Sequence, residues 1–119
     1  MKKVNIEKKL SQFSDYWNPK VVGALNGQEV ELIKFKGIFP WYKHEKEDEL
    51  FFVVKGDFNM EFRDRTVHLK KQEFLIVPKG TEHPKEANKE VSVMFFEPAK
   101  TLNTGDQQNE FTKPVLSTI

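Results

Sequence analysis

The sequence predicts an all-β domain, a small barrel or sandwich preceded by a short helix and followed by an extended tail. From Lys20 onward, short apolar or alternating runs are separated by turn residues. About seven or eight such runs follow one another at intervals of roughly 8–12 residues, the spacing typical of sandwiches and barrels. A chain of 119 residues has room for one core, so residues 1–119 are expected to form a single domain.

The first predicted elements are a helix and a hairpin. Residues 5–13 place their apolar side chains on one helical face. Asn26-Gly27 is a strong turn signal between Val21-Val22 and the extended run 30–35. Within that run the apolar phase shifts by one residue, which indicates a β-bulge or burial of both faces of the strand.

Further extended runs follow, each ended by turn residues. Their apolar residues alternate with polar ones or form short continuous stretches. The phenylalanines of these runs are expected mostly to fill the core. The runs are residues 49–55, 58–62, 66–70, 74–77 and 91–96. The segment after Pro98 is polar and is predicted to be the extended tail.

The composition excludes several classes of protein. Lys and Arg number 19 and Asp and Glu 18, a net charge of +1, so no nucleic-acid partner is expected. The absence of cysteine excludes disulfides and thiolate zinc sites. No apolar run approaches the roughly 20 residues of a membrane helix, and none follows the basic N-terminus as in a secretory signal. We therefore expect no membrane partner and a cytoplasmic location.

The chain has three histidines, and two of them mark a candidate site. If residues 41–44 are extended, Tyr42 and His44 point to the same side of a sheet. Glu49 starts the next strand, and His83 follows the turn that ends another. His68 lies on the polar face of its run and is predicted to be exposed without a role. Two imidazoles and one carboxylate are the ligand set of a mononuclear Fe(II), Mn(II) or Zn(II) site with open positions.

These segments resemble the two conserved motifs of the cupin superfamily, Gx5HxHx3–4Ex6G and Gx5PxGx2Hx3N. His44-x4-Glu49-x6-Gly56 matches the second half of the first motif, and Pro78-x-Gly80-x2-His83 matches the core of the second. Residues 97–106 resemble the ending of small single-domain bacterial cupins of the cupin-2 barrel type, sometimes labelled mannose-6-phosphate-isomerase-like. The resemblance implies a double-stranded β-helix, or jelly-roll barrel, with a central pocket and a motif region of about 36–98.

One departure from the family pattern bears on the site. The family's first metal-binding histidine falls on Tyr42, so the usual set of three histidines and one glutamate is reduced to His44, Glu49 and His83. Tyr42 is a further candidate metal ligand, or it donates a hydrogen bond to a metal-bound water or a substrate, or it fills space in a decayed site. Trp41 and Tyr42 are expected to line the pocket.

Three functions of different classes fit these residues. In the first, the chain is a small enzyme, of the sugar-phosphate isomerase or dioxygen-dependent kind, whose three-ligand site holds a divalent Fe, Mn, Ni or Zn ion. In the second, a metal-free pocket recognises a small molecule through Tyr42, His44 and His83. In the third, the site is vestigial and the barrel is an interaction module. The sequence favours binding of a metal and a small molecule in the pocket, and it leaves open whether the protein turns that molecule over.

Because the predicted barrel has free strand edges, two copies of the chain are expected to associate. An edge exposes unpaired backbone groups, and pairing of two copies covers them. We therefore expect a homodimer formed through a sheet edge, to which the N-terminal segment or the extended tail contributes.

Overall fold

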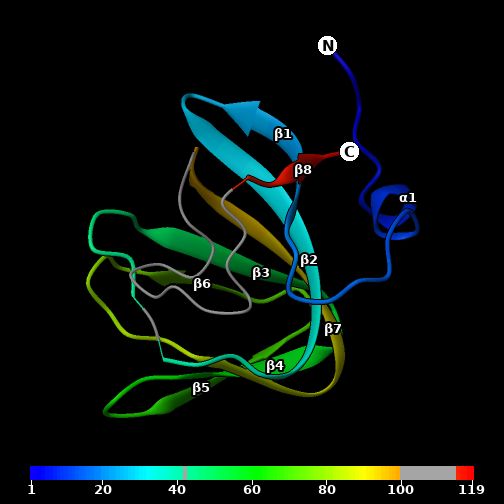
Figure 1. Cartoon of the computed structure of the whole chain (residues 1–119). Helices are drawn as coiled ribbons and strands as arrows, with labels where there is room; N and C mark the ends of the chain where they lie inside the picture. Colours follow the sequence, from blue (N-terminus) through cyan, green and yellow to red (C-terminus); the bar gives the residue numbers. More distant parts are fainter. Residues whose placement is uncertain (42, 100–114) are drawn as a thin grey trace.

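The computed structural model describes residues 1–41, 43–99 and 115–119. Within these residues the all-β prediction is confirmed, with one short helix ahead of the strands (Figure 1). In chain order the elements are α1 (Ile6–Leu10), β1 (Lys20–Leu25), β2 (Gln28–Ile38), β3 (Glu49–Lys55), β4 (Asp57–Glu61), β5 (Thr66–Lys70), β6 (Phe74–Val77), β7 (Lys85–Pro98) and β8 (Ser117–Thr118). Tyr42 and residues 100–114, which include most of the predicted tail, lie outside the described residues. No helix in the described part of the chain is long and apolar enough to cross a membrane.

Helix α1 is shorter than predicted because a distant lysine binds carbonyl groups at its last residue and shortly after it. The helix begins after Asn5, whose side chain accepts a hydrogen bond from the backbone N–H of Lys8 at 2.9 Å. It ends at Leu10 rather than at Phe13. The Lys34 ammonium donates to the carbonyl oxygens of Leu10 and Phe13, at 2.8 and 2.7 Å. These bonds replace helical ones and tie α1 to β2.

Strand β7 runs from one layer of the barrel into the other. The hydrogen-bonded order is β5-β4-β7-β2-β1-β8, and β3 pairs with both β6 and β7. The first residues of β7, Lys85 and Glu86, pair with β4, whereas residues 92–96 pair with β3. In Figure 1, β4 and β5 therefore lie below β3 and β6, and β2 and β7 curve past both layers.

Strand β2 is buried on both faces where its apolar phase shifts, and residues 30–35 pair with β7 without interruption, so burial of both faces rather than a bulge explains the shift. Glu31, Leu32 and Ile33 are exposed by 1%, 0% and 4%, although neighbouring residues of a strand face opposite sides. The register with β7 shifts between Phe35 and Gly37, and Gly37 has a φ of 93°. A bulge bends a strand locally, and this one lets β2 follow β7 between the layers.

Glycine is required at position 56 because two backbones approach each other there. Gly56 follows β3 and has a φ of 86°, in the left-handed region. A Cβ atom at this position would lie 2.9 Å from the carbonyl oxygen of Glu90 and 3.3 Å from the Cα of Val91. The glycine that closes the first sequence motif thus allows β3, with Glu49 at its start, to lie against β7.

Aromatic side chains fill the space between the two layers. Trp17 stacks on Phe35 with ring centroids 4.6 Å apart, and Phe35 meets Phe58 edge to face at 5.2 Å. Phe51 and Phe95 form a second edge-to-face pair at 4.8 Å. Such pairs add about 0.5–1.5 kcal/mol each to the stabilisation that comes from burial. Inward-facing residues of β3 and β7 are part of this core.

The sheet formed by β6, β3, β7 and β2 also carries apolar side chains on its outer face. Cross-strand partners share a face, and two rows of partners cross these four strands. The rows, together called the outer apolar face, are Ile76, Leu50, Phe96 and Val30, and Phe74, Phe52, Met94 and Leu32. Phe74 and Ile76 are exposed by 59% and 54%. The prediction that the strand phenylalanines mostly fill the core is therefore wrong for Phe52, Phe74 and Phe96, which lie on this outer face.

Candidate metal centre

The structure brings three of the predicted site residues together inside the barrel. His44 lies in the loop before β3, Glu49 is the first residue of β3, and His83 lies just before β7. Glu49 Oε1 is 2.8 Å from His44 Nε2 and 3.1 Å from His83 Nε2. One potential ligand atom from each residue lies within 4.8 Å of the other two. All three residues are buried, with exposed fractions of 3%, 4% and 1%.

Hydrogen bonds hold the two histidine-bearing loops against each other. The backbone N–H of Gly80 donates to the carbonyl oxygen of His44 at 2.7 Å. The backbone N–H of Lys79 donates to Asp48 Oδ1 at 2.8 Å. Gly80 has a φ of 78°, a conformation that favours glycine. The turn ahead of His83 therefore also fixes the position of His44, which explains how the two motifs meet.

His83 is held in the tautomer whose Nε2 lone pair faces Glu49. Its Nδ1 lies 2.6 Å from the carbonyl oxygen of Thr81, and because a carbonyl only accepts, Nδ1 carries the proton and donates. Burial lowers the pKa of His83, although the Glu49 carboxylate acts in the opposite direction. The neutral ring presents a lone pair to a carboxylate oxygen at 3.1 Å. Two such acceptors meet favourably when a proton or a metal cation lies between them.

Glu49 supplies the negative charge of this group. Burial alone would raise the pKa of Glu49, but hydrogen bonds with Glu97 and His44 outweigh it and hold the pKa well below its ordinary value. Glu49 is therefore ionised at neutral pH. Two imidazole nitrogens and one carboxylate, all buried and all turned toward one point, are a donor set that fits a divalent transition-metal ion.

Three further ionisable residues lie buried near this group, and none of them was predicted from the sequence. Glu31, Glu97 and Lys85 are exposed by 1%, 2% and 3%. Burial raises the pKa of Glu97 well above its ordinary value and that of Glu31 to about 7. Burial likewise lowers the pKa of Lys85 to about 8. The Lys85 Nζ lies 4.9 Å from the ring centroid of Phe39 and 5.1 Å from that of Phe51, within the range of cation–π attraction.

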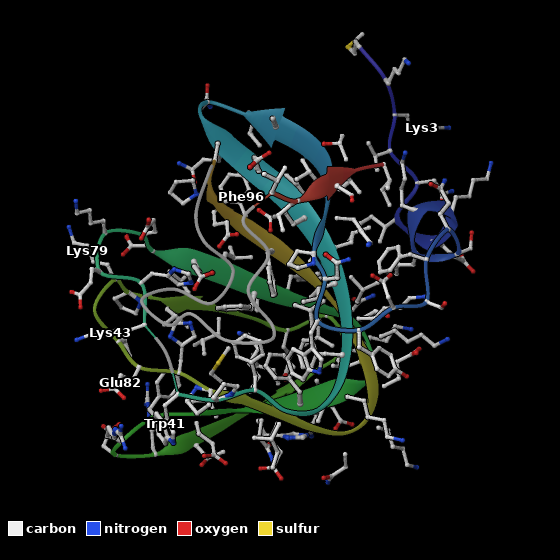
Figure 2. The ribbon with its side chains drawn as sticks, viewed as in Figure 1. Lys3, Trp41, Lys43, Lys79, Glu82 and Phe96 are labelled. Atoms are coloured by element: carbon white, nitrogen blue, oxygen red, sulfur yellow. The ribbon has the colours of Figure 1, made fainter. Side chains whose placement is uncertain are left out.

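Trp41 takes part in a contact that links the two histidine-bearing loops from outside. Its ring centroid lies 3.9 Å from the guanidinium carbon of Arg63, and Arg63 forms a 2.6 Å salt bridge with Glu82, the residue before His83. Figure 2 shows Trp41 and Glu82 at the same end of the barrel, away from α1. Arg63 is exposed, so this salt bridge contributes about 1 kcal/mol at most.

The other two predicted positions have different outcomes. Tyr42 lies outside the described residues, so its predicted place in the pocket stays a prediction. His68 is exposed, as predicted, and its Nδ1 lies 2.6 Å from Asn59 Oδ1 on the neighbouring strand β4. His68 is therefore separate from the three buried site residues.

Comparison with known proteins decides the family. Residues 29–97 match the family described as Cupin domain. The chain belongs to the cupin family. The match spans both motifs, from β2 to the end of β7, and the barrel described above is the jelly-roll fold that the motifs imply.

Solved and curated relatives support this membership. A cupin-2 domain containing protein from Shewanella frigidimarina is 36% identical, with a TM-score of 0.79 over 80% of this chain and 93% of that one. Protein NMB1881 from Neisseria meningitidis is 25% identical, with a TM-score of 0.76 over 82% of this chain and all of that one (100%). The Bacillus subtilis protein named "Uncharacterized protein YdbB" is 38% identical over 63 residues, which span 52% of this chain and 56% of that protein.

Proposed function

We propose that this cupin binds one divalent transition-metal ion at His44, Glu49 and His83 and a small molecule beside it in the barrel. The observation that supports the proposal is the approach of the neutral His83 Nε2 to the ionised Glu49 Oε1 at 3.1 Å, deep in the protein. A cation would be bound by both atoms. His44 Nε2, 2.8 Å from the same oxygen, would be the third ligand.

The donor set narrows the choice of metal. Two imidazoles and one carboxylate suit Fe(II), Mn(II), Ni(II) or Zn(II) better than the hard cations Ca²⁺ and Mg²⁺, which prefer oxygen ligands. When bound, such an ion acts as a Lewis acid that polarises an oxygen atom of its ligand. Three protein ligands leave coordination positions for a small molecule. Tyr42, at the family's first histidine position, is proposed to contact that molecule or the metal.

Metal content tests the proposal directly. Untagged protein purified without chelator is expected to contain close to one Fe, Mn, Ni or Zn per chain by elemental mass spectrometry. That result would make sugar phosphates and oxygen-dependent substrates the first compounds to screen for turnover. Protein that stays metal-free after reconstitution with each of these ions would contradict the proposal and favour the metal-free binding module instead.

We also propose that the protein forms a homodimer in which the outer apolar faces of two copies meet. The contact would cover the side chains of this face that are still accessible to solvent, among them the exposed Phe74 and Ile76, whereas Leu32 is already buried within one copy. Sheets pack face to face in this way at about 10 Å. A two-fold axis allows the same face to serve both copies. This places the contact on a sheet face rather than on an edge.

The mass in solution checks this arrangement. Light scattering at micromolar concentration is expected to give the mass of a dimer for the wild type and that of a monomer for Ile76→Lys, because a lysine would bury a charge in the contact. Leu25→Lys is the matched control, since Leu25 is 48% exposed on β1 and outside the outer apolar face. A monomeric wild type, or dissociation by Leu25→Lys to the same extent, would argue against the proposed interface.

A further inference from the structure

Three buried carboxyl groups lie on three neighbouring strands. Glu97 on β7 has Glu49 on β3 to one side and Glu31 on β2 to the other. The pairing of Leu50 with Phe96 places Glu49 beside Glu97, and the pairing of Glu31 with Phe95 places Glu31 diagonal to it. Side-chain hydrogen bonds connect Glu97 to both of its neighbours. The three groups therefore form a continuous row that ends at the candidate metal centre.

The row requires protons on some of its members. A carboxylate oxygen is an acceptor only, so two carboxyl groups can bond to each other only if one of them is protonated. Among the described residues, no N–H or O–H donor reaches the buried oxygens Glu97 Oε2 and Glu31 Oε1. Glu49 faces two imidazoles and is the anionic member of the row. The hydrogen bond between Glu97 and Glu49 must therefore be donated by Glu97.

The geometry points to Glu97, supported by Glu31, as the positioning residue that fixes the Glu49 carboxylate so that Oε1 faces His44 and His83. This inference rests on the proposed metal site and adds to it a group that binds no metal itself. Partners of this kind restrict the orientation of a metal ligand, and their loss typically weakens metal binding about 10–100-fold. Glu97 is not among the residues implied by the cupin motifs, which end before it.

Metal affinity in two variants of Glu97 separates a positioning role from a purely structural one. Replacing the Glu97 carboxyl group by leucine removes a polar group that is costly to bury, but it also leaves Glu49 and Glu31 without their hydrogen bonds to Glu97, so the two effects on the stability of the fold oppose each other. The same change removes the donor that orients Glu49, so metal binding is expected to weaken. Glutamine keeps an N–H donor toward Glu49 at nearly the same size, and it is the conservative variant that should rescue binding.

The experiment is a Co²⁺ titration of metal-free wild type, Glu97→Leu, Glu97→Gln and Glu31→Leu, followed by visible absorption, with thermal unfolding of each metal-free protein. We expect Glu97→Leu to bind Co²⁺ 10–100-fold more weakly and Glu97→Gln to bind within about threefold of the wild type, and the melting temperatures show whether each metal-free variant is folded. Glu31→Leu is expected to weaken binding less, because it acts through Glu97.

Two kinds of failure can be told apart. If the wild type binds Co²⁺ and Glu97→Leu binds it equally tightly, or if Glu97→Gln is as weak as Glu97→Leu, the positioning role is wrong and the metal site stands. If the wild type binds no Co²⁺, the metal site and the positioning role are both wrong. If Glu97→Leu fails to fold, Glu97→Gln and Glu31→Leu still test the positioning role of Glu97. Weak Co²⁺ binding by Glu97→Gln would overturn this role, and so would Co²⁺ binding by Glu31→Leu that is as tight as that of the wild type.

Discussion

His44→Ala and His83→Ala proteins are expected to leave purification without bound metal, whereas His68→Ala is expected to keep the metal content of the wild type. Each of the first two changes removes one of three ligands from a buried group whose atoms lie within 4.8 Å of one another. The loss in affinity should exceed about 100-fold, the upper end of what loss of an indirect partner costs. His68 contacts Asn59 on the barrel surface and is not part of this group.

Elemental mass spectrometry measures the metal, and circular dichroism checks the fold. His83 is 1% exposed and packs beside Phe51, with ring centroids 5.8 Å apart, so alanine also leaves a cavity there. His83→Gln fills most of that space and is the second variant for this position. Equal loss of metal from all three histidine-to-alanine proteins would show that the metal does not depend on this site. If His44→Ala and His83→Ala both keep the full metal content of the wild type, the metal is bound at another site.

The strands and the three candidate ligands could be predicted because they depend on local sequence patterns. On β4, Phe58 and Met60 alternate with polar residues and face the core of the barrel. Pro78 and Gly80 mark the end of a strand and shape the turn that precedes His83. The match to the cupin motifs then indicated that these strand ends meet in space, which no local pattern could have shown.

The bounds of the helix and of the longest strand could not be predicted because they depend on distant contacts. The end of α1 is decided by Lys34, more than 20 residues away along the chain. Strand β7 begins at Lys85 rather than at the predicted Val91. The residues between them include three exposed positions, 88–90, where β7 passes from one layer to the other. A polar stretch of that kind looks like a loop in sequence.

The buried carboxyl groups were missed although the sequence carries a signal for them. Glu31 is in phase with Ile33 and Phe35, and Glu97 is in phase with Phe95, so the period of two places both glutamates on the inward face. A single glutamate in an apolar strand is ordinarily read as exposed, because ionised carboxylates are rarely buried. Here the two groups share hydrogen bonds with each other, which only the adjacency of β2 and β7 makes possible.

Glu31→Gln is expected to raise the free energy of unfolding of the metal-free protein by about 3 kcal/mol at pH 8 and to change it little at pH 4.5. Burial raises the pKa of Glu31 from 4.5 to about 7, the hydrogen bond with Glu97 opposes this, and the charges of Glu29 and Glu49 add to it. One pKa unit corresponds to about 1.4 kcal/mol.

The sign follows from the protons bound in each state. Between pH 4.5 and 7 the folded wild type keeps the Glu31 proton that the unfolded chain releases, so its stability falls as the pH rises and stays lower above pH 7. Glutamine has no proton to lose and removes this penalty. Urea unfolding of wild type and Glu31→Gln across this range measures the difference, with the exposed Glu45→Gln as control. Stability curves for wild type and Glu31→Gln that stay parallel from pH 4.5 to 8 would mean that folding does not raise the pKa of Glu31, and they would contradict the prediction.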